Sequence, residues 1–183
     1  MSLANRDAAV AALGKLNLTG GNAELARYWL SLWDGDSLPS RSAFNPAKIK
    51  SLLPGIGLFD VRPGESVRCR LAGGIIQTVI NHPLTGADWR SYTPKDQWEQ
   101  RLHRNSQIAC GAVGIGIRHG TDTSGPIRAI ELQLPFGDVS EDGARMMLFH
   151  LDWKPGVYES YRTRGESAAA IADEYVAIGL TDG

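Results

Sequence analysis

The chain has 183 residues, of which 43% are hydrophobic and 21% are charged, as expected for one globular domain with extra residues at its ends. Its formal net charge of −1 and the lack of a basic block argue against binding to nucleic acid or to an anionic membrane surface. The sequence shows no signal-peptide pattern and no apolar run near the ~20 residues of a membrane helix, so we expect a cytoplasmic protein.

The N-terminal third is predicted to be helical. Residues 1–22 are rich in alanine and small polar residues and are expected to form a flexible or helical tail. Asn22 is the predicted N-cap of a helix that starts at Ala23. Its apolar stripe has helical spacing and consists of Leu25, Tyr28, Trp29, Leu32 and Trp33. A second helix is expected to begin at Pro46, with Asn45 as its N-cap.

Five strands are predicted from the alternation of apolar and polar residues. Their expected ranges are 56–61, 67–71, 112–117, 129–136 and 146–153. Helices are predicted between the second and third strands, over 75–80 and 94–109. A hairpin, then helices, then a three-stranded meander indicates an α+β fold with one antiparallel sheet and helices on one face.

The C-terminal region is predicted to lie outside this sheet. Lys154-Pro155-Gly156 breaks the last strand, and residues 166–179 carry an apolar stripe at i, i+4, i+7 that predicts a helix. The stripe consists of Ile171, Tyr175 and Ile178. The expected divisions of the chain are a tail over 1–22, a domain over 23–153 and a helical extension over 154–183.

Short motifs in the first half of the chain carry a family resemblance. In chain order they are Tyr28-Trp29-Leu30, Leu38-Pro39-Ser40-Arg41, Asn45-Pro46, Leu52-Leu53-Pro54, Leu58-Phe59-Asp60-Val61, Arg68-Cys69-Arg70-Leu71-Ala72-Gly73 and Leu84-Thr85-Gly86. Over about residues 23–153 this order resembles a family of short, stand-alone bacterial PAS domains. The resemblance implies a five-stranded PAS sheet, with helical extensions at both ends here, and a role in sensing and docking.

Most residues of these motifs are expected to be structural. Proline and glycine fix turns and the ends of helices. Asp60 and Arg70 are predicted to pair across the first hairpin and so to fix its register. Gly74 departs from the family, which usually has a small hydroxylated residue there, and this removes a candidate helix cap or ligand contact.

The space between the sheet and its helices is the expected ligand site. Its lining is predicted by placing the apolar positions of the last three strands toward the helices. The predicted lining residues are Ile76, Val79, Trp89, Trp98, Leu102, Val113, Ile115, Ile117, Leu132, Leu134, Phe149 and Leu151. These side chains either pack as a filled core or enclose a cavity for a small apolar molecule, and PAS domains do both.

The other face of the sheet is expected to need a cover. Gly114 and Gly116 would leave it almost bare, and Met146 and Leu148 would make it apolar. In many PAS domains a lead-in helix packs there and also builds a dimer. The predicted interface set is Leu25, Tyr28, Trp29, Leu32, Trp33, Gly114, Gly116, Met146 and Leu148. The sequence leaves open whether this cover comes from the same chain, from the second chain of a homodimer, or from both.

No cofactor, metal site or catalytic group is predicted. Flavin-adduct PAS domains carry a cysteine in an Asn-Cys-Arg-Phe context that this chain lacks. Haem-binding PAS domains use a histidine on the helix before the third strand, where His103 is expected to face outward. Glu131 and His150 lie on neighbouring strands and would suit acid–base work, but both are expected to point away from the pocket.

The sequence is compatible with three functions. The favoured hypothesis is a PAS-type sensor that binds a small apolar molecule, a regulatory protein partner or both, and that signals through its flanking helices. The alternative is a ligand-free adaptor that dimerises through its sheet face. The third is a small α+β isomerase or hydratase, which requires ionisable groups in the pocket, where almost wholly apolar strand positions are expected.

Overall fold

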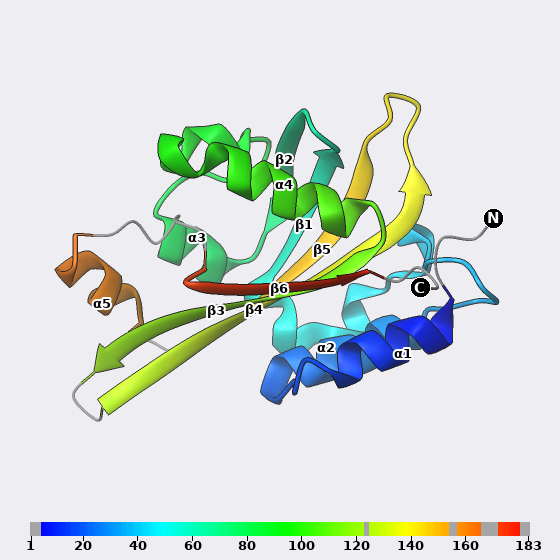
Figure 1. Cartoon of the computed structure of the whole chain (residues 1–183), viewed down its shortest axis with the longest axis horizontal. Helices are drawn as coiled ribbons and strands as arrows, with labels where there is room; N and C mark the ends of the chain where they lie inside the picture. Colours follow the sequence, from blue (N-terminus) through cyan, green and yellow to red (C-terminus); the bar gives the residue numbers. More distant parts are fainter. Residues whose placement is uncertain (1–4, 123–124, 154–156, 166–171, 180–183) are drawn as a thin grey trace.

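The computed structural model describes residues 5–122, 125–153, 157–165 and 172–179. Within these residues six strands form one antiparallel sheet (Figure 1). The strands are β1 (Ile56–Arg62), β2 (Ser66–Ala72), β3 (Ala112–Asp122), β4 (Gly125–Val139), β5 (Arg145–Asp152) and β6 (Glu174–Gly179). Their order across the sheet is β2-β1-β5-β4-β3-β6. The predicted α+β fold and its hairpin and meander are confirmed.

The β1–β2 hairpin has the predicted charged pair. The Nε of Arg70 donates to Oδ2 of Asp60 at 3.0 Å, and Asp60 lies opposite Arg68 in the antiparallel register. The Arg70 side chain is more than half exposed, so the pair is expected to contribute ~1 kcal/mol or less to stability. Its main consequence is to select one register of the hairpin.

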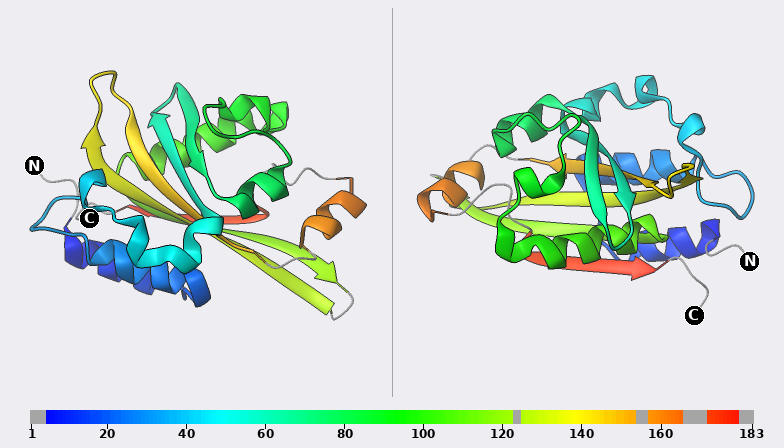
Figure 2. Two further views of the ribbon diagram at one scale, coloured as in Figure 1. Left: turned by 180° about the vertical axis from the view of Figure 1, so that it is seen from behind. Right: turned by 90° about the horizontal axis from the view of Figure 1, so that it is seen from above.

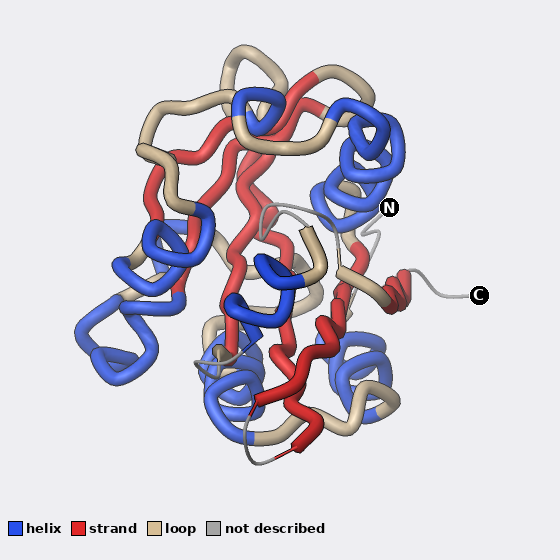
Figure 3. The backbone as a smooth tube through the Cα atoms, turned by 90° about the vertical axis from the view of Figure 1, so that its left-hand side faces the viewer, coloured by secondary structure: helices blue, strands red, loops and turns tan. Residues whose placement is uncertain are grey.

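Helices cover both faces of the sheet, as Figure 3 shows. On one face lie α3 (Gly74–Ile80) and α4 (Trp98–Ala109), joined by short 3₁₀ turns. On the other face lie α1 (Arg6–Gly14), α2 (Gly20–Leu30) and the 3₁₀ segment η2 (Pro46–Gly55). Within the described residues, no helix is long and apolar enough to cross a lipid bilayer.

The N-terminal tail contains a packed helix. Asn5 caps α1, because its Oδ1 accepts the N–H of Ala8 at 2.8 Å. Helix α1 buries Ala9, Ala12 and Leu13 and packs beside α2. Residues 6–14 are therefore helical and buried on one side, and the prediction of a flexible or helical tail resolves in favour of the helix.

Helix α2 begins at Gly20 and not at Ala23. Its N-cap is Thr19, and the predicted cap Asn22 lies inside the helix. The Asn22 amide points toward the sheet, where its Nδ2 donates to the carbonyl of Ile130 at 3.0 Å. The prediction failed because a partner 108 residues away in the chain takes up the side chain that was expected to cap the helix locally.

The segment η2 starts as predicted. The Oδ1 of Asn45 accepts the N–H of Ala47 at 3.0 Å, and Pro46 occupies the first position. The hydroxyl of Tyr28 also donates to the carbonyl of Asn45 at 3.1 Å, which ties α2 to η2.

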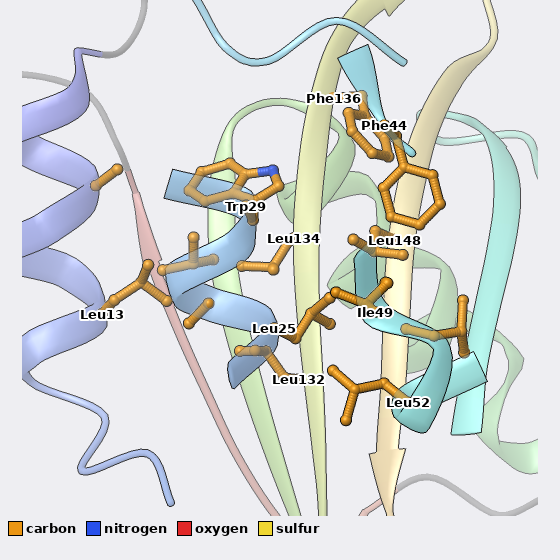
Figure 4. Close-up of a cluster of buried hydrophobic side chains, with 14 of the residues drawn as sticks. Leu13, Leu25, Trp29, Phe44, Ile49, Leu52, Leu132, Leu134, Phe136 and Leu148 are labelled. Carbon is orange, nitrogen blue, oxygen red and sulfur yellow. The ribbon is translucent and has the colours of Figure 1, made fainter. Parts of the chain in front are cut away.

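A buried apolar cluster joins α1, α2 and η2 to the sheet (Figure 4). Leu25 and Trp29 of α2 point into it and are fully buried. The indole Nε1 of Trp29 donates to the carbonyl of Pro135 on β4 at 2.9 Å, so its one polar group is satisfied. The first helix of the predicted domain therefore covers the sheet within the same chain.

The C-terminal helix predicted over 166–179 is wrong for the described part of that range. Residues 174–179 form β6, which pairs with β3 over six positions, whereas residues 166–171 lie outside the described residues. A short run such as Tyr175-Val176-Ala177-Ile178 fits a helix and a strand alike. Residues 174–179 form a strand because pairing with the open edge of β3 satisfies the backbone hydrogen-bonding groups of that edge.

Strands β3 and β4 extend well beyond the other strands at one end (Figure 2). Helix α5 (Val157–Thr163) lies beside this extension, and Val157 is fully buried. The hydroxyl of Ser160 accepts the N–H of Thr121 at 2.6 Å. The region after β5 is thus attached to the sheet at two places, through α5 and through β6.

Candidate functional site

A cavity of about 50 Å³ lies between the sheet and the helices α3 and α4. This is the volume open to the centres of water-sized atoms, and a single water needs roughly 10–15 Å³ by that measure. The cavity therefore has room for a few water-sized groups. The strands β1, β3, β4 and β5 form its floor, and α3 and α4 form its roof.

One half of the lining is apolar. It consists of Phe59, Ile76, Val79, Ile80, Leu84, Met147, Phe149 and Leu151. The rings of Phe59 and Phe149 meet edge to face with their centroids 5.9 Å apart, which gives this half a rigid aromatic wall. The apolar half suits the body of a small hydrophobic group.

The other half of the lining is polar and charged. An ion pair lies at its floor, where Nη2 of Arg118 on β3 is 3.2 Å from Oε2 of Glu131 on β4. Both residues are buried, at 8% and 6% exposure. Gly116 lies directly opposite Glu131, and a Cβ at Gly116 would come within 2.5 Å of the Glu131 side chain. The glycine therefore provides the space that the carboxylate occupies.

Gly114 has a similar role toward β6. Tyr175 on β6 reaches across β3, and its hydroxyl donates to Oε1 of Gln133 on β4 at 3.0 Å. A Cβ at Gly114 would come within 2.6 Å of the Tyr175 oxygen. Burial raises the pKa of Tyr175, so its hydroxyl keeps its proton and acts as a donor. The guanidinium of Arg104 on α4 stacks over the Tyr175 ring at 4.4 Å.

Arg101, one turn before Arg104 on α4, completes the polar half. Its Nη1 donates to Oγ1 of Thr93 at 2.9 Å, and its guanidinium lies 5.4 Å from the ring centre of Tyr92. Burial lowers the pKa of Arg101, while Tyr92 and Glu131 partly offset that effect. Arginine still carries its charge, because its ordinary pKa is far above neutral.

Tyr92 presents a protected hydroxyl at the cavity. Burial raises its pKa to about 12, so the group is a phenol and not a phenolate at neutral pH. The hydroxyl oxygen is buried and has no hydrogen-bond partner among the residues that the structure describes. A buried donor in this state costs free energy that a hydrogen-bonding ligand would recover.

Four of the predicted lining residues line this cavity: Ile76, Val79, Phe149 and Leu151. Trp89, Trp98 and Leu102 lie in the same apolar cluster, behind the cavity wall. The indoles of Trp89 and Trp98 meet edge to face, with their centroids 6.0 Å apart. These three residues support the wall and do not form it.

The other strand residues were assigned to the wrong face. The misplaced side chains are Val113, Ile115, Ile117, Leu132 and Leu134; four of them lie in the cluster beneath α1 and α2, and Ile117 shares their side of β3 by alternation. Because both faces of this sheet are covered, hydrophobicity does not reveal which face the cavity adjoins. The larger apolar residues of β3 and β4 pack under the N-terminal helices.

The predicted interface set divides in the same way. Met146 and Leu148 face α2, as predicted, in the cluster that holds Leu25 and Trp29. Tyr28, Leu32 and Trp33 are partly buried at its margin. Gly114 and Gly116, in contrast, lie on the cavity face. The expected bare stripe is therefore filled by Tyr175 and Glu131 from the neighbouring strands.

Glu131 and His150 were both expected to point away from the pocket, and this expectation is wrong for Glu131. Glu131 lines the cavity, whereas His150 is buried on the opposite face against α2. The Nδ1 of His150 lies 2.7 Å from Oδ1 of Asn22. Burial lowers the pKa of His150, and nearby Asp152 and Glu24 partly offset this effect. The two residues lie on opposite sides of the sheet and cannot act together.

The expectation of an almost wholly apolar pocket is wrong. Arg101, Arg104, Arg118 and Glu131 all line the cavity. The condition that would have excluded an enzyme is therefore not met. Among the described residues of the lining, however, none is a histidine, cysteine, serine or lysine, so the set offers hydrogen-bond donors and charge more than a nucleophile with its base.

A sequence signal for the polar half does exist. Glu131 and Gln133 alternate with large apolar residues on β4, and Arg101, Arg104 and Asn105 share one face of α4. Glu131 was expected to point away from the pocket, and charged residues such as the two arginines of α4 are seldom buried. Strand alternation correctly predicts which residues share one face of a strand, but it does not show which of the two faces lines the cavity.

The geometry agrees with a comparison of the chain to known families. A family model described as a PAS domain matches residues 19–140. The chain belongs to the PAS domain family. The match runs from just before α2 to just after the end of β4, so it includes α2, α3, α4 and the strands β1 to β4. A search of curated proteins found no match to the chain. In this PAS domain the cavity lies between the sheet and the helices α3 and α4.

Proposed function

We propose that this PAS domain is a cytoplasmic regulatory module that binds a small molecule in its cavity and passes the event to its flanking helices. The observation that carries the proposal is a cavity that combines an apolar wall with buried, aligned polar groups. Such a combination is typical of ligand sites, in which polar groups fix orientation and apolar surface supplies affinity.

Strands β4 and β5 offer a route from the cavity to α2. On β5, Phe149 and Leu151 line the cavity, while the alternate residue His150 contacts the start of α2. On β4, Glu131 lines the cavity and its neighbour Leu132 packs beneath α2. A ligand that shifts these strands therefore changes the surface on which α2 rests.

Helix α2 is attached to β4 near both of its ends and to β5 near its start. Near its start, Asn22 bonds to the carbonyl of Ile130 and to His150. Near its end, Trp29 bonds to the carbonyl of Pro135. Through these bonds, movement of the strands would move α2. A regulatory protein partner, or the second chain of a homodimer, would then bind the outer side of the helix pair α1 and α2.

A ligand-free adaptor is the second candidate, and the small size of the cavity favours it. In that case the core would be effectively filled, and the protein would act through contacts alone. The sheet face that we expected such an adaptor to use is covered by α1, α2 and η2 within the chain. The adaptor would need the outer surface of these helices instead.

The experiment that separates the candidates is native mass spectrometry of the protein purified from its own host. We expect a small molecule to co-purify under gentle conditions and to be released on denaturation. Its mass would begin to identify the ligand. A clean mass of the bare chain from several preparations would contradict the ligand-binding proposal and favour the adaptor.

A further inference from the structure

Two neutral polar groups of the cavity lining have no hydrogen-bond partner among the residues that the structure describes. One is the hydroxyl of Tyr92, whose oxygen is buried. The other is the side-chain amide of Asn105 on α4, a residue with only 5% of its surface exposed. Because both residues line the cavity, a molecule inside it can bind both groups.

Arg101 places the two groups on the same side of the cavity. It lies one turn before Asn105 on α4, and side chains four positions apart share one face of a helix. Its guanidinium lies 5.4 Å from the ring centre of Tyr92. The hydroxyl and the amide therefore belong to the α4 side of the lining, across from the apolar residues of β1 and β5.

Unpaired polar groups in a buried site cost free energy. A buried donor or acceptor without a partner loses its hydration and gains no hydrogen bond in return. Other polar groups of the lining already have partners. Glu131 accepts a hydrogen bond from Arg118, and Gln133 accepts one from Tyr175. The Tyr92 hydroxyl and the Asn105 amide are thus the groups whose hydrogen bonds a ligand would complete.

The chemistry of these two groups selects a complementary ligand. A side-chain amide presents a carbonyl acceptor and N–H donors in one plane, so a ligand with an N–H beside a C=O pairs with both of its polar atoms. The ligand carbonyl has a second lone pair, which accepts from the Tyr92 hydroxyl. A carboxylate accepts only and would leave the carbonyl of Asn105 unpaired.

An amide within a small ring has this arrangement of donor and acceptor. In an open-chain secondary amide the trans peptide geometry directs the N–H and the C=O in opposite directions, whereas a small ring holds them on one edge. The cavity volume of about 50 Å³ limits the ring to roughly five atoms unless side chains move.

We propose that the ligand of this cavity is a small cyclic amide, whose polar edge binds Asn105 and Tyr92. This inference rests on the proposed function and names the chemical class of its ligand. The ring carbons contact the apolar half of the lining, where Phe59 and Phe149 form the aromatic wall.

The test is an NMR titration of the full-length protein with pyrrolidinone, a five-membered cyclic amide, and with cyclopentanone. Cyclopentanone has the same ring size and the same carbonyl acceptor but no N–H donor. We expect pyrrolidinone to bind at least about tenfold more tightly, a difference of ~1.4 kcal/mol, because it alone pairs with both polar atoms of Asn105. Asn105→Leu, a change of similar size, should abolish this preference.

Tyr92→Phe tests the hydroxyl with two independent measurements. It should weaken pyrrolidinone binding by about tenfold. Without ligand it should leave the urea midpoint unchanged or raise it, because it removes an unpaired buried group. Loss of a structural hydrogen bond would instead lower the midpoint. Tyr28→Phe is the matched control, because its hydroxyl bonds to Asn45 beside the other face of the sheet, and it should leave the affinity for pyrrolidinone unchanged.

Equal binding of pyrrolidinone and cyclopentanone to the wild type, or binding of neither, would overturn the inference. An unchanged affinity for pyrrolidinone in Tyr92→Phe would also overturn it. The proposed function is tested separately by the co-purified molecule. A co-purified molecule without an amide would leave the ligand sensor standing and remove only the cyclic-amide class, whereas a bare chain would contradict the sensor itself.

Discussion

At the scale of single residues, two glycines decide what the cavity contains. Gly114 and Gly116 on β3 lack side chains where Tyr175 and Glu131 cross the strand. With any larger residue, these polar groups would be pushed out of the lining. We had expected the same glycines to admit α2 on the opposite face, and the structure explains the difference by the pairing of β6, which brings Tyr175 across the strand.

Gly116→Val should destabilise the protein by roughly 1–3 kcal/mol, as overpacking of a filled core does. The reason is that a Cβ at this position would come within 2.5 Å of Glu131. Gly74→Ala is the control, because it meets open space at the start of α3 and should be neutral or stabilising by less than ~1 kcal/mol. Urea unfolding of both variants measures the difference, and equal midpoints would contradict this account of the glycine.

His150 should make the stability of the protein sensitive to acid. Burial lowers its pKa in the folded state, so the unfolded chain, which titrates near ~6.5, takes up a proton first as the pH falls. The contribution to stability is therefore present above pH ~6.5 and is lost as the pH falls through the folded-state pKa.

Removing the imidazole should remove this part of the pH dependence. We expect His150→Gln to show a shallower loss of stability than the wild type between about pH 6.5 and 5. The measurement is the free energy of urea unfolding at a series of pH values in that interval. Parallel curves for the two proteins would show that His150 is not buried as a neutral side chain.

At the scale of elements, the hairpin and most helices could be predicted from the sequence, but the face of the sheet on which a side chain lies could not. The Asn45-Pro46 start and the Asp60–Arg70 pair depend on neighbours in the chain, and both are present. The N-terminal position of α2 and the identity of β6 depend on partners far away in sequence, and both predictions failed. The polar half of the cavity was missed for the same reason. Whether a strand face lines the cavity depends on which helices cover that face.

Truncation after residue 171 tests the role of β6. Removal of this strand would expose the backbone edge of β3 and withdraw Tyr175 from Gln133 and Arg104. We expect a lower urea midpoint and a tendency to self-associate through the open edge, seen as a higher mass in light scattering. Val176→Thr, at an exposed position of β6, is the control and should behave like the wild type. A truncated chain of unchanged stability and mass would contradict the structural role of the strand.

At the scale of the whole molecule, the sheet is a shared wall between two compartments. One side holds an apolar cluster beneath α1 and α2, and the other holds the cavity with its charged half. Neighbouring residues of β4 and β5 project into both compartments. We therefore predict that a small change in the cavity reaches helices that do not line it.

Hydrogen–deuterium exchange tests that claim most directly. It is measured on the full-length protein with its co-purified molecule bound and again after the molecule has been removed. We predict that exchange changes in α2, near Asn22 and Trp29, as well as in α3 and α4, while the β1–β2 turn stays the same. A change confined to α3 and α4, with α2 unaffected, would show that the cavity does not communicate with the N-terminal helices.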